Sequence, residues 1–97
     1  MHASIRRYKV DSKSVGEVFQ KANDGFVPTI STVPGFVGYY GLDAGNGELV
    51  TISLFKDQTG TKESERVAEE WVRKNVSHLL QTPPEITTGE VGMHKTN

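Results

Sequence analysis

Three side chains that can do chemistry follow one another at helical spacing in the second half of the chain: Trp71, Asn75 and His78. Residues three and four apart on a helix are neighbours, so these side chains are expected to form one ridge. An aromatic plate, an amide and an imidazole on one ridge can hold and polarise a flat phenolic ligand, or ligate a haem iron. The spacing therefore predicts a ligand site along this helix.

A structural role explains the same residues without any ligand. Trp71 on an amphipathic helix can be a core or dimer anchor, because an indole buries a large apolar surface. His78 stands near the end of the expected helix, where a cationic imidazole suits the negative end of the helix dipole. Both explanations stay open from the sequence alone.

Two adjacent tyrosines and one phenylalanine are further candidates. Tyr39 and Tyr40 lie on an expected strand, where successive side chains point to opposite faces, so only one can look into a cleft beside a helix. A phenol there can donate a hydrogen bond to a ligand carbonyl, although strand tyrosines also serve for packing alone. Phe26 stands where Pro28 interrupts a helical pattern, and such an irregularity can line a pocket.

The remaining titratable residues indicate no metal or nucleotide. Glu90 and His94 are an even number of residues apart on the expected last strand, so they can share a face as an acid/base pair. His2, His78 and His94 do not have the spacing of metal ligands, and no glycine-rich phosphate loop precedes a helix. We expect no metal and no other cofactor.

Composition narrows the functional classes. The chain has 97 residues, with 11 Lys and Arg against 12 Asp and Glu and no cysteine. This balance gives no electrostatic footprint for nucleic acid or an anionic membrane, and the lack of cysteine excludes disulfides and thiol chemistry. No apolar run reaches the ~20 residues of a membrane span, and the start lacks the apolar core of a secretory signal. We expect one domain, residues 1–97, in the cytoplasm.

A central hairpin is the element around which the others are arranged. Pro34 and Gly35 end the helical pattern before them, and an aromatic run of residues typical of strands follows. Asn46 and Gly47 then supply the positive φ angles of a tight turn, and residues 48–55 are expected to form the return strand. The hairpin therefore places Tyr39 and Tyr40 in the middle of a sheet.

A first helix is expected before this hairpin. Ser14 followed by Glu17 is the pattern of a capping box, which predicts a helix that begins at Val15. Its apolar stripe continues to Val33 at helical spacing, which indicates one face packed on a core. Pro28 removes a helical hydrogen bond, so a kink or a restart is expected near it.

The remaining elements complete the fold. A second helix is expected from about Thr61 to Leu80, a first strand near residues 5–10 and a last strand over residues 85–94. The order is β-α-β-β-α-β, which right-handed crossovers fold into a four-stranded antiparallel sheet with both helices on one face. The predicted fold class is α+β, with the ferredoxin-like arrangement.

Apolar residues occupy both faces of the two hairpin strands. One helical layer buries one face of a sheet, so apolar residues on the second face indicate contact with another sheet. A chain of this length also builds only a thin core, which a partner subunit would supplement. We expect a homodimer that associates through its sheet faces.

The order of elements and several residue patterns resemble the dimeric α/β-barrel superfamily, and within it the antibiotic biosynthesis monooxygenase (ABM)-like domains. The resemblance rests on residues 33–38 (Val-Pro-Gly-Phe-Val-Gly), residues 53–55 (Ser-Leu-Phe) and the helix around Trp71. It spans nearly the whole chain. It implies a homodimeric barrel with a cleft between each sheet and its helices.

The resemblance implies a cofactor-independent monooxygenase or related oxidoreductase that acts on a small aromatic ligand of phenol or quinone type. In that chemistry the protein deprotonates the phenol and holds the anion, which reacts with dioxygen in a dry pocket. The expected base is His78, and the group expected to stabilise the oxyanion is Asn75 or Tyr39. The expected ligand contacts are Trp71, Tyr40 and Phe26. The alternatives are a homodimer that binds a small molecule without turnover and one with a packed, empty cleft.

Haem-degrading members of the superfamily pair a helix tryptophan and a helix histidine with an asparagine on the first strand. This chain has Arg6, Arg7 and Tyr8 there and no asparagine. The resemblance therefore favours the cofactor-independent members over the haem-degrading ones.

Overall fold

A tight turn at Asn46 and Gly47 joins strand β2 (Phe36–Gly45) to strand β3 (Glu48–Phe55) in the computed structural model, which describes all 97 residues. The φ angles of Asn46 and Gly47 are 56° and 79°, in the region that asparagine and glycine tolerate best. The hairpin predicted from the sequence is confirmed.

The other two strands extend this hairpin into a four-stranded antiparallel sheet. Strand β1 (His2–Lys9) pairs with β3 on one side and with β4 (Glu85–Glu90) on the other, which gives the order β2-β3-β1-β4. This order is the ferredoxin-like topology, so the predicted fold class is confirmed. Strand β4 ends at Glu90, and His94 lies beyond it, so these two residues do not share a strand as expected.

The first helical segment is continuous but changes its winding. It consists of α1 (Val15–Lys21), a π-helical turn η2 (Ala22–Phe26) and α2 (Val27–Ile30). The N–H of Val27 donates to the carbonyl of Ala22, five residues earlier, and Pro28 stands in the first turn of α2, where a missing N–H is tolerated. The predicted interruption near Pro28 is therefore a widened turn and not a break.

The capping box predicted at Ser14 and Glu17 is wrong. The side chain of Ser14 makes no cap hydrogen bond, and its backbone has φ −95° and ψ −5° instead of the extended angles of an N-cap. The carboxylate of Asp11 accepts a hydrogen bond from the N–H of Lys13 at 2.9 Å and opens a 3₁₀ turn, η1 (Ser12–Ser14), ahead of α1. Asp11 therefore caps this end of the segment.

Helix α3 (Gln58–Asn75) begins earlier and ends earlier than predicted. Asp57 caps it and accepts hydrogen bonds from the N–H groups of Thr59 at 3.0 Å and Gly60 at 3.3 Å. A 3₁₀ turn, η3 (Ser77–Leu79), follows its C-terminal end. Neither α3 nor any other helix is long and apolar enough to cross a membrane.

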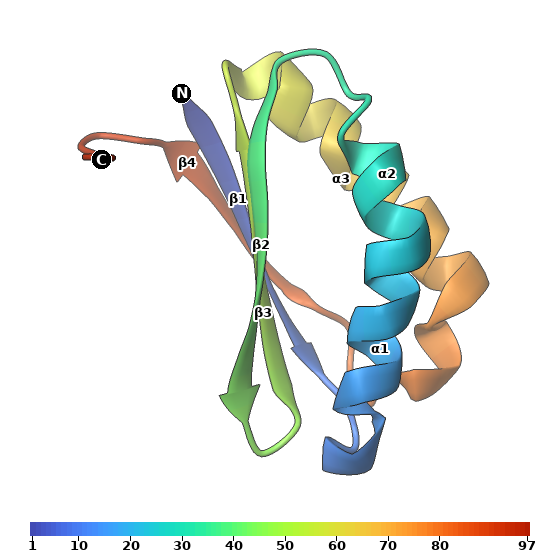
Figure 1. Ribbon diagram of the computed structural model, residues 1–97. Helices are drawn as coiled ribbons and strands as arrows, with labels where there is room; N and C mark the ends of the chain where they lie inside the picture. Colours follow the sequence, from blue (N-terminus) through green and yellow to red (C-terminus); the bar gives the residue numbers. More distant parts are fainter.

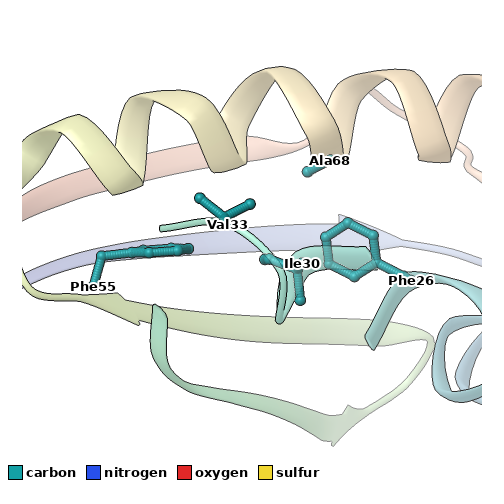
Figure 2. Packing of buried hydrophobic residues seen from close by; sticks show 5 residues of the cluster. All are labelled: Phe26, Ile30, Val33, Phe55 and Ala68. Atoms are coloured by element: carbon teal, nitrogen blue, oxygen red, sulfur yellow. The ribbon is translucent and has the colours of Figure 1, made fainter. Parts of the chain in front are cut away.

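Both helical segments cover the same face of the sheet (Figure 1). Figure 2 shows the larger core cluster in this layer, where Phe26 and Ile30 lie beneath Ala68 of α3, with Val33 and Phe55 beyond them. A second buried cluster, made of Val10, Val15, Val18 and Leu49, joins the segment just after β1 to β3 and α1. The two clusters leave a space between them, and the cavity between the sheet and the helices lies in this space.

The opposite face of the sheet carries no helix (Figure 1). Tyr40 on β2 pairs in register with Ile52 on β3, and Ile52 pairs with Ile5 on β1, so these side chains form a row on one face. Tyr40 is 58% exposed and Leu42, two residues further along β2, is 49% exposed. This face is open and carries exposed apolar side chains beside the ion pair of Arg7 and Glu48, so the apolar residues expected on the second face are present.

The glycines of the turn allow a prediction about stability. Gly45 and Gly47 both have positive φ, so alanine at either position is strained by about 1–2 kcal/mol. A Cβ on Gly47 would also overlap the carbonyl oxygen of Val10, whereas a Cβ on Gly45 meets nothing within 4 Å. We expect urea unfolding to show that Gly47→Ala costs at least about 1 kcal/mol more than Gly45→Ala. Equal losses would contradict the close approach to Val10.

Candidate ligand-binding site

A cavity of about 460 Å³ lies between the sheet and the helices. This volume is in the ordinary range of small-molecule sites. Thirteen of its 19 lining residues are hydrophobic, and they come from the three strands β1–β3, the first helical segment, α3 and its C-terminal extension. The cavity is therefore the cleft between sheet and helices that the resemblance implied.

One wall of the cavity is aromatic and is made by residues of both helical segments and by Tyr39 of β2. Phe26 of the π-helical turn meets Tyr39 of β2 edge to face, with ring centroids 5.4 Å apart. The same ring lies 5.5 Å from the indole of Trp71 on α3. Phe19, Ala22 and Val72 extend this wall. The rings of Phe26, Tyr39 and Trp71 are therefore held at the distances that aromatic pairs prefer, and they line the cavity.

The π-helical turn determines how Trp71 sits. A Cβ on Gly25 would lie 3.0 Å from Nε1 of Trp71, so the indole lies directly against the backbone of the turn. The turn also places Ala22, Asn23 and Phe26 on the cavity. Widened turns of this kind recur at functional sites because they redirect side chains without ending the helix.

The sheet side of the cavity is a polar floor. Arg6 of β1 pairs in register with Thr51 of β3, and Tyr39 pairs with Ser53 of the same strand. Because side chains opposite one another on paired strands share a face, these residues come together under the aromatic wall. Tyr8 follows Arg6 on the same face of β1 and also lines the cavity.

The hydroxyl of Tyr39 stays protonated at neutral pH. Burial raises the pKa of this phenol from its ordinary 10 to about 12, and the neighbouring Tyr8 also raises it, while Thr51 and the Arg6 guanidinium act in the opposite direction. A neutral phenol donates a hydrogen bond. Tyr39 is therefore suited to hold a ligand oxygen and not to remove a proton.

The structure brings together half of the candidates that the sequence predicted. Tyr39, Phe26 and Trp71 line the cavity. Tyr40, Asn75 and His78 do not line it. Tyr40 points to the open face of the sheet, as the alternation of a strand requires once Tyr39 faces the helices.

The ridge expected from Trp71, Asn75 and His78 is not formed, because α3 ends at Asn75. The amide Nδ2 of Asn75 donates to the carbonyl oxygen of Trp71 at 2.8 Å and is exposed. His78 lies in the 3₁₀ turn η3 and is exposed as well. A helix that stopped one turn later would have carried all three side chains on one side.

The sequence analysis missed the polar floor. Ser4, Arg6 and Tyr8 occupy alternate positions of β1, and the core residue Val10 continues the alternation just after the strand, so the alternation alone turns Arg6 toward the helices. A charged residue at a core-facing position of a strand was the available signal. No group of His, Asp or Glu side chains in the chain is arranged to hold a metal ion.

Solved structures share this fold over almost the whole chain. The monooxygenase ActVA-Orf6 of Streptomyces coelicolor, solved in complex with nanaomycin D, has a TM-score of 0.79 and 19% identity over 99% of this chain and 91% of its own. A variant of SnoaB, a cofactor-independent oxygenase from Streptomyces nogalater, has a TM-score of 0.74 and 14% identity, over 96% of this chain and 94% of its own. A protein of unknown function from Nitrosomonas europaea has a TM-score of 0.78 and 19% identity, over 99% of this chain and 93% of its own.

These similarities show that the chain has the fold of the antibiotic biosynthesis monooxygenase structures, so the resemblance stated from the sequence is confirmed at the level of fold. No family model matches the sequence, and no curated protein matches it. The shared fold does not by itself fix an activity, because one fold hosts many chemistries.

The pKa of Tyr39 predicts a loss of stability in alkali. The unfolded chain releases this proton above about pH 10, whereas the folded chain keeps it until about pH 12, so the free energy of unfolding falls between these values. A difference of two pKa units corresponds to about 2–3 kcal/mol. Urea unfolding from about pH 9 to pH 12 should show this additional loss in the wild type and not in Tyr39→Phe. Parallel pH profiles would contradict the buried, protonated phenol.

Proposed function

We propose that this chain binds a small, flat aromatic ligand of phenol or quinone type in the cavity and acts on it as a cofactor-independent monooxygenase. The observation that carries the proposal is the aromatic wall of Phe26, Trp71 and Tyr39 above a polar floor. The shared fold with a monooxygenase solved with nanaomycin D supports it.

Each side of the cavity has a role in binding. The aromatic wall orients a planar ring system through offset and edge-to-face contacts. The hydroxyl of Tyr39 donates a hydrogen bond to a ligand oxygen, and the hydroxyls of Thr51 and Ser53 can donate or accept beside it. The apolar remainder of the lining keeps water away from the ring, which strengthens these few polar contacts.

The reaction needs no electrons from a cofactor. In the keto tautomer of such a phenol one ring carbon carries two hydrogens. This carbon gives up both, takes one oxygen atom of dioxygen and becomes a carbonyl; the second oxygen atom leaves with the two hydrogens as water. The ligand supplies all four electrons that reduce dioxygen. The protein contributes a fixed orientation, a group that holds the developing oxyanion and a dry site.

Removal of a proton from the ligand is the step that the cavity residues support least. None of its lining residues is Asp, Glu or His. The assignment of the base to His78 stays a prediction, and the position of this residue outside the lining does not support it. The absence of a base from the lining is also the observation that favours the second candidate function, which is small-molecule binding without turnover.

A pair of adjacent tyrosines tests the binding site. Calorimetric titration with 2-naphthol, a flat phenol, should give a dissociation constant that rises about fivefold in Tyr39→Phe, because one hydrogen bond is worth about 1 kcal/mol. Tyr40→Phe, which removes the same atom on the opposite face, should leave the constant unchanged. Equal effects of the two substitutions would place the ligand elsewhere.

Oxygen uptake with anthrone then separates the two candidate functions. Uptake above the rate of the buffer, lowered in Tyr39→Phe, supports the monooxygenase, whereas binding of 2-naphthol without uptake supports the non-catalytic alternative. His78→Ala belongs in the same assay, since an unchanged rate removes the assignment of the base to this residue.

We also propose that the chain forms a homodimer through the face of the sheet that the helices leave open. The row Tyr40, Ile52 and Ile5, with the exposed Leu42 beside it, gives this face an apolar surface across three strands. A contiguous apolar patch on a small domain is a typical site of association.

A charge placed in this patch should separate the subunits. Leu42→Lys is expected to give a monomer in sedimentation equilibrium, because an unpaired cation would be buried at the interface. Gln20→Lys, an equivalent charge on the exposed side of α1, should leave the mass unchanged. A monomeric wild type, or a Leu42→Lys variant with the mass of the wild type, would refute the association through this face.

A further inference from the structure

Arg6 is the one residue with a full charge at neutral pH among those that line the cavity. It is only 7% exposed. A guanidinium is cationic at every pH at which a protein folds, and it carries five N–H donors and no acceptor. The cavity therefore contains a permanent positive charge that is almost wholly removed from water.

No carboxylate of the chain neutralises this charge. The ion pairs involve Arg7, Lys21, Arg66 and Lys74, and Arg6 is in none of them. Its guanidinium donates to the hydroxyl of Tyr8 and to the backbone carbonyl of Glu65, each at 3.4 Å. Both distances are long for hydrogen bonds to a charged group, which are usually near 2.8 Å.

The neighbouring Arg7 shows how a protein usually accommodates an arginine, which is at the surface and beside a carboxylate. Arg7 points to the other face of β1, where its side chain is 53% exposed and lies 3.6 Å from the carboxylate of Glu48. A buried cation without a partner destabilises a fold, and an apolar side chain of similar volume is often more stable in its place. Packing alone therefore does not account for an arginine at position 6.

We propose that the cavity selects planar aromatic monoanions that are already ionised in solution, with the charged oxygen atoms bound by Arg6. The inference rests on the proposed function for the place and the flat shape of the ligand, and it adds the ligand's charge. Because the lining has no base, the ligand has to bring its negative charge with it, as a carboxylate or an acidic hydroxyl group does.

The floor around Arg6 fits such a group. Thr51 lies opposite Arg6 in the strand register, and Gly41, on the other side of Thr51, lets the ring of Phe19 pack against the sheet beside it. The protonated hydroxyl of Tyr39 is a second donor in the same cavity. A planar carboxylate can accept two parallel hydrogen bonds from a guanidinium, which fixes its orientation as well as its charge.

A matched pair of probes tests the charge of the ligand separately from its shape. Sodium 2-naphthoate and naphthalene-2-carboxamide have nearly the same outline, and only the first is an anion at pH 7. Calorimetric titration of the wild type should show that naphthoate binds about 10- to 100-fold more tightly, the range expected for hydrogen bonds to a charged group.

Two adjacent arginines supply the matched variants. Arg6→Met keeps the length and apolar stem of the side chain, and it should abolish the preference for naphthoate while both probes still bind. Arg6→Lys, which keeps the charge but loses the planar fork, should retain part of the preference. Arg7→Met removes an equal charge from the opposite face and should leave the preference intact, which excludes a general effect of net charge.

Thermal unfolding controls for the fold of these variants. Arg6→Met without ligand should melt cooperatively, at a temperature equal to or above that of the wild type, because an unpaired buried charge has been removed. A lower melting temperature would mean that Arg6 stabilises the empty protein, and it would overturn the inference.

The titrations distinguish failure of this inference from failure of the proposed function. Equal affinity of the wild type for naphthoate and the carboxamide, with 2-naphthol also bound, overturns the selection of anions and leaves the aromatic site standing. A preference that persists in Arg6→Met places the anion elsewhere and overturns the role of Arg6. Binding of none of the three compounds overturns the proposed function and this inference together.

Discussion

The register of the β2–β3 hairpin is the constraint on which the cavity depends. The turn at Asn46 and Gly47, together with the register shift between Asp43 and Gly45, fixes which residues of β2 and β3 are paired, and the pairing decides which side chains face the helices. A slip by one residue would bring Tyr40 under the helices and turn Tyr39 outward. It would also remove Tyr39 from the edge of Phe26, so the aromatic wall and the polar floor both depend on this register.

The helical layer changes its winding locally beside the cavity. The π-helical turn η2 places one extra residue in the segment between α1 and α2, and this brings Asn23 and Phe26 to the same cavity. Gly25 in this turn lets Trp71 approach the backbone. The resulting cavity separates two small core clusters that a compact packing would have merged, so the fold gives up buried apolar contacts where the cavity opens.

Sequence patterns predicted the topology because they depend on neighbours along the chain. The Asn46 and Gly47 turn and the alternation of Tyr39 and Tyr40 were correct, since turn chemistry and strand geometry decide them locally. The prediction of a ridge along Trp71, Asn75 and His78 was wrong because the sequence does not mark the end of α3. The residues around this end all tolerate a helix. Arg6 was overlooked because its environment comes from strands and helices far away in the sequence, although its place between Ser4 and Tyr8 on β1 already turned it inward.

The central place of β1 has a consequence for the order of assembly during synthesis. The N-terminal strand is made first, but both of its partners, β3 and β4, follow much later in the chain. The hairpin of β2 and β3 closes through local contacts and can form early, whereas β1 needs long loops to close around it. Until residue 90 has left the ribosome, β1 has one unpaired edge. The cavity floor comes from β1, β2 and β3 alone, so it can be completed before β4 joins the sheet.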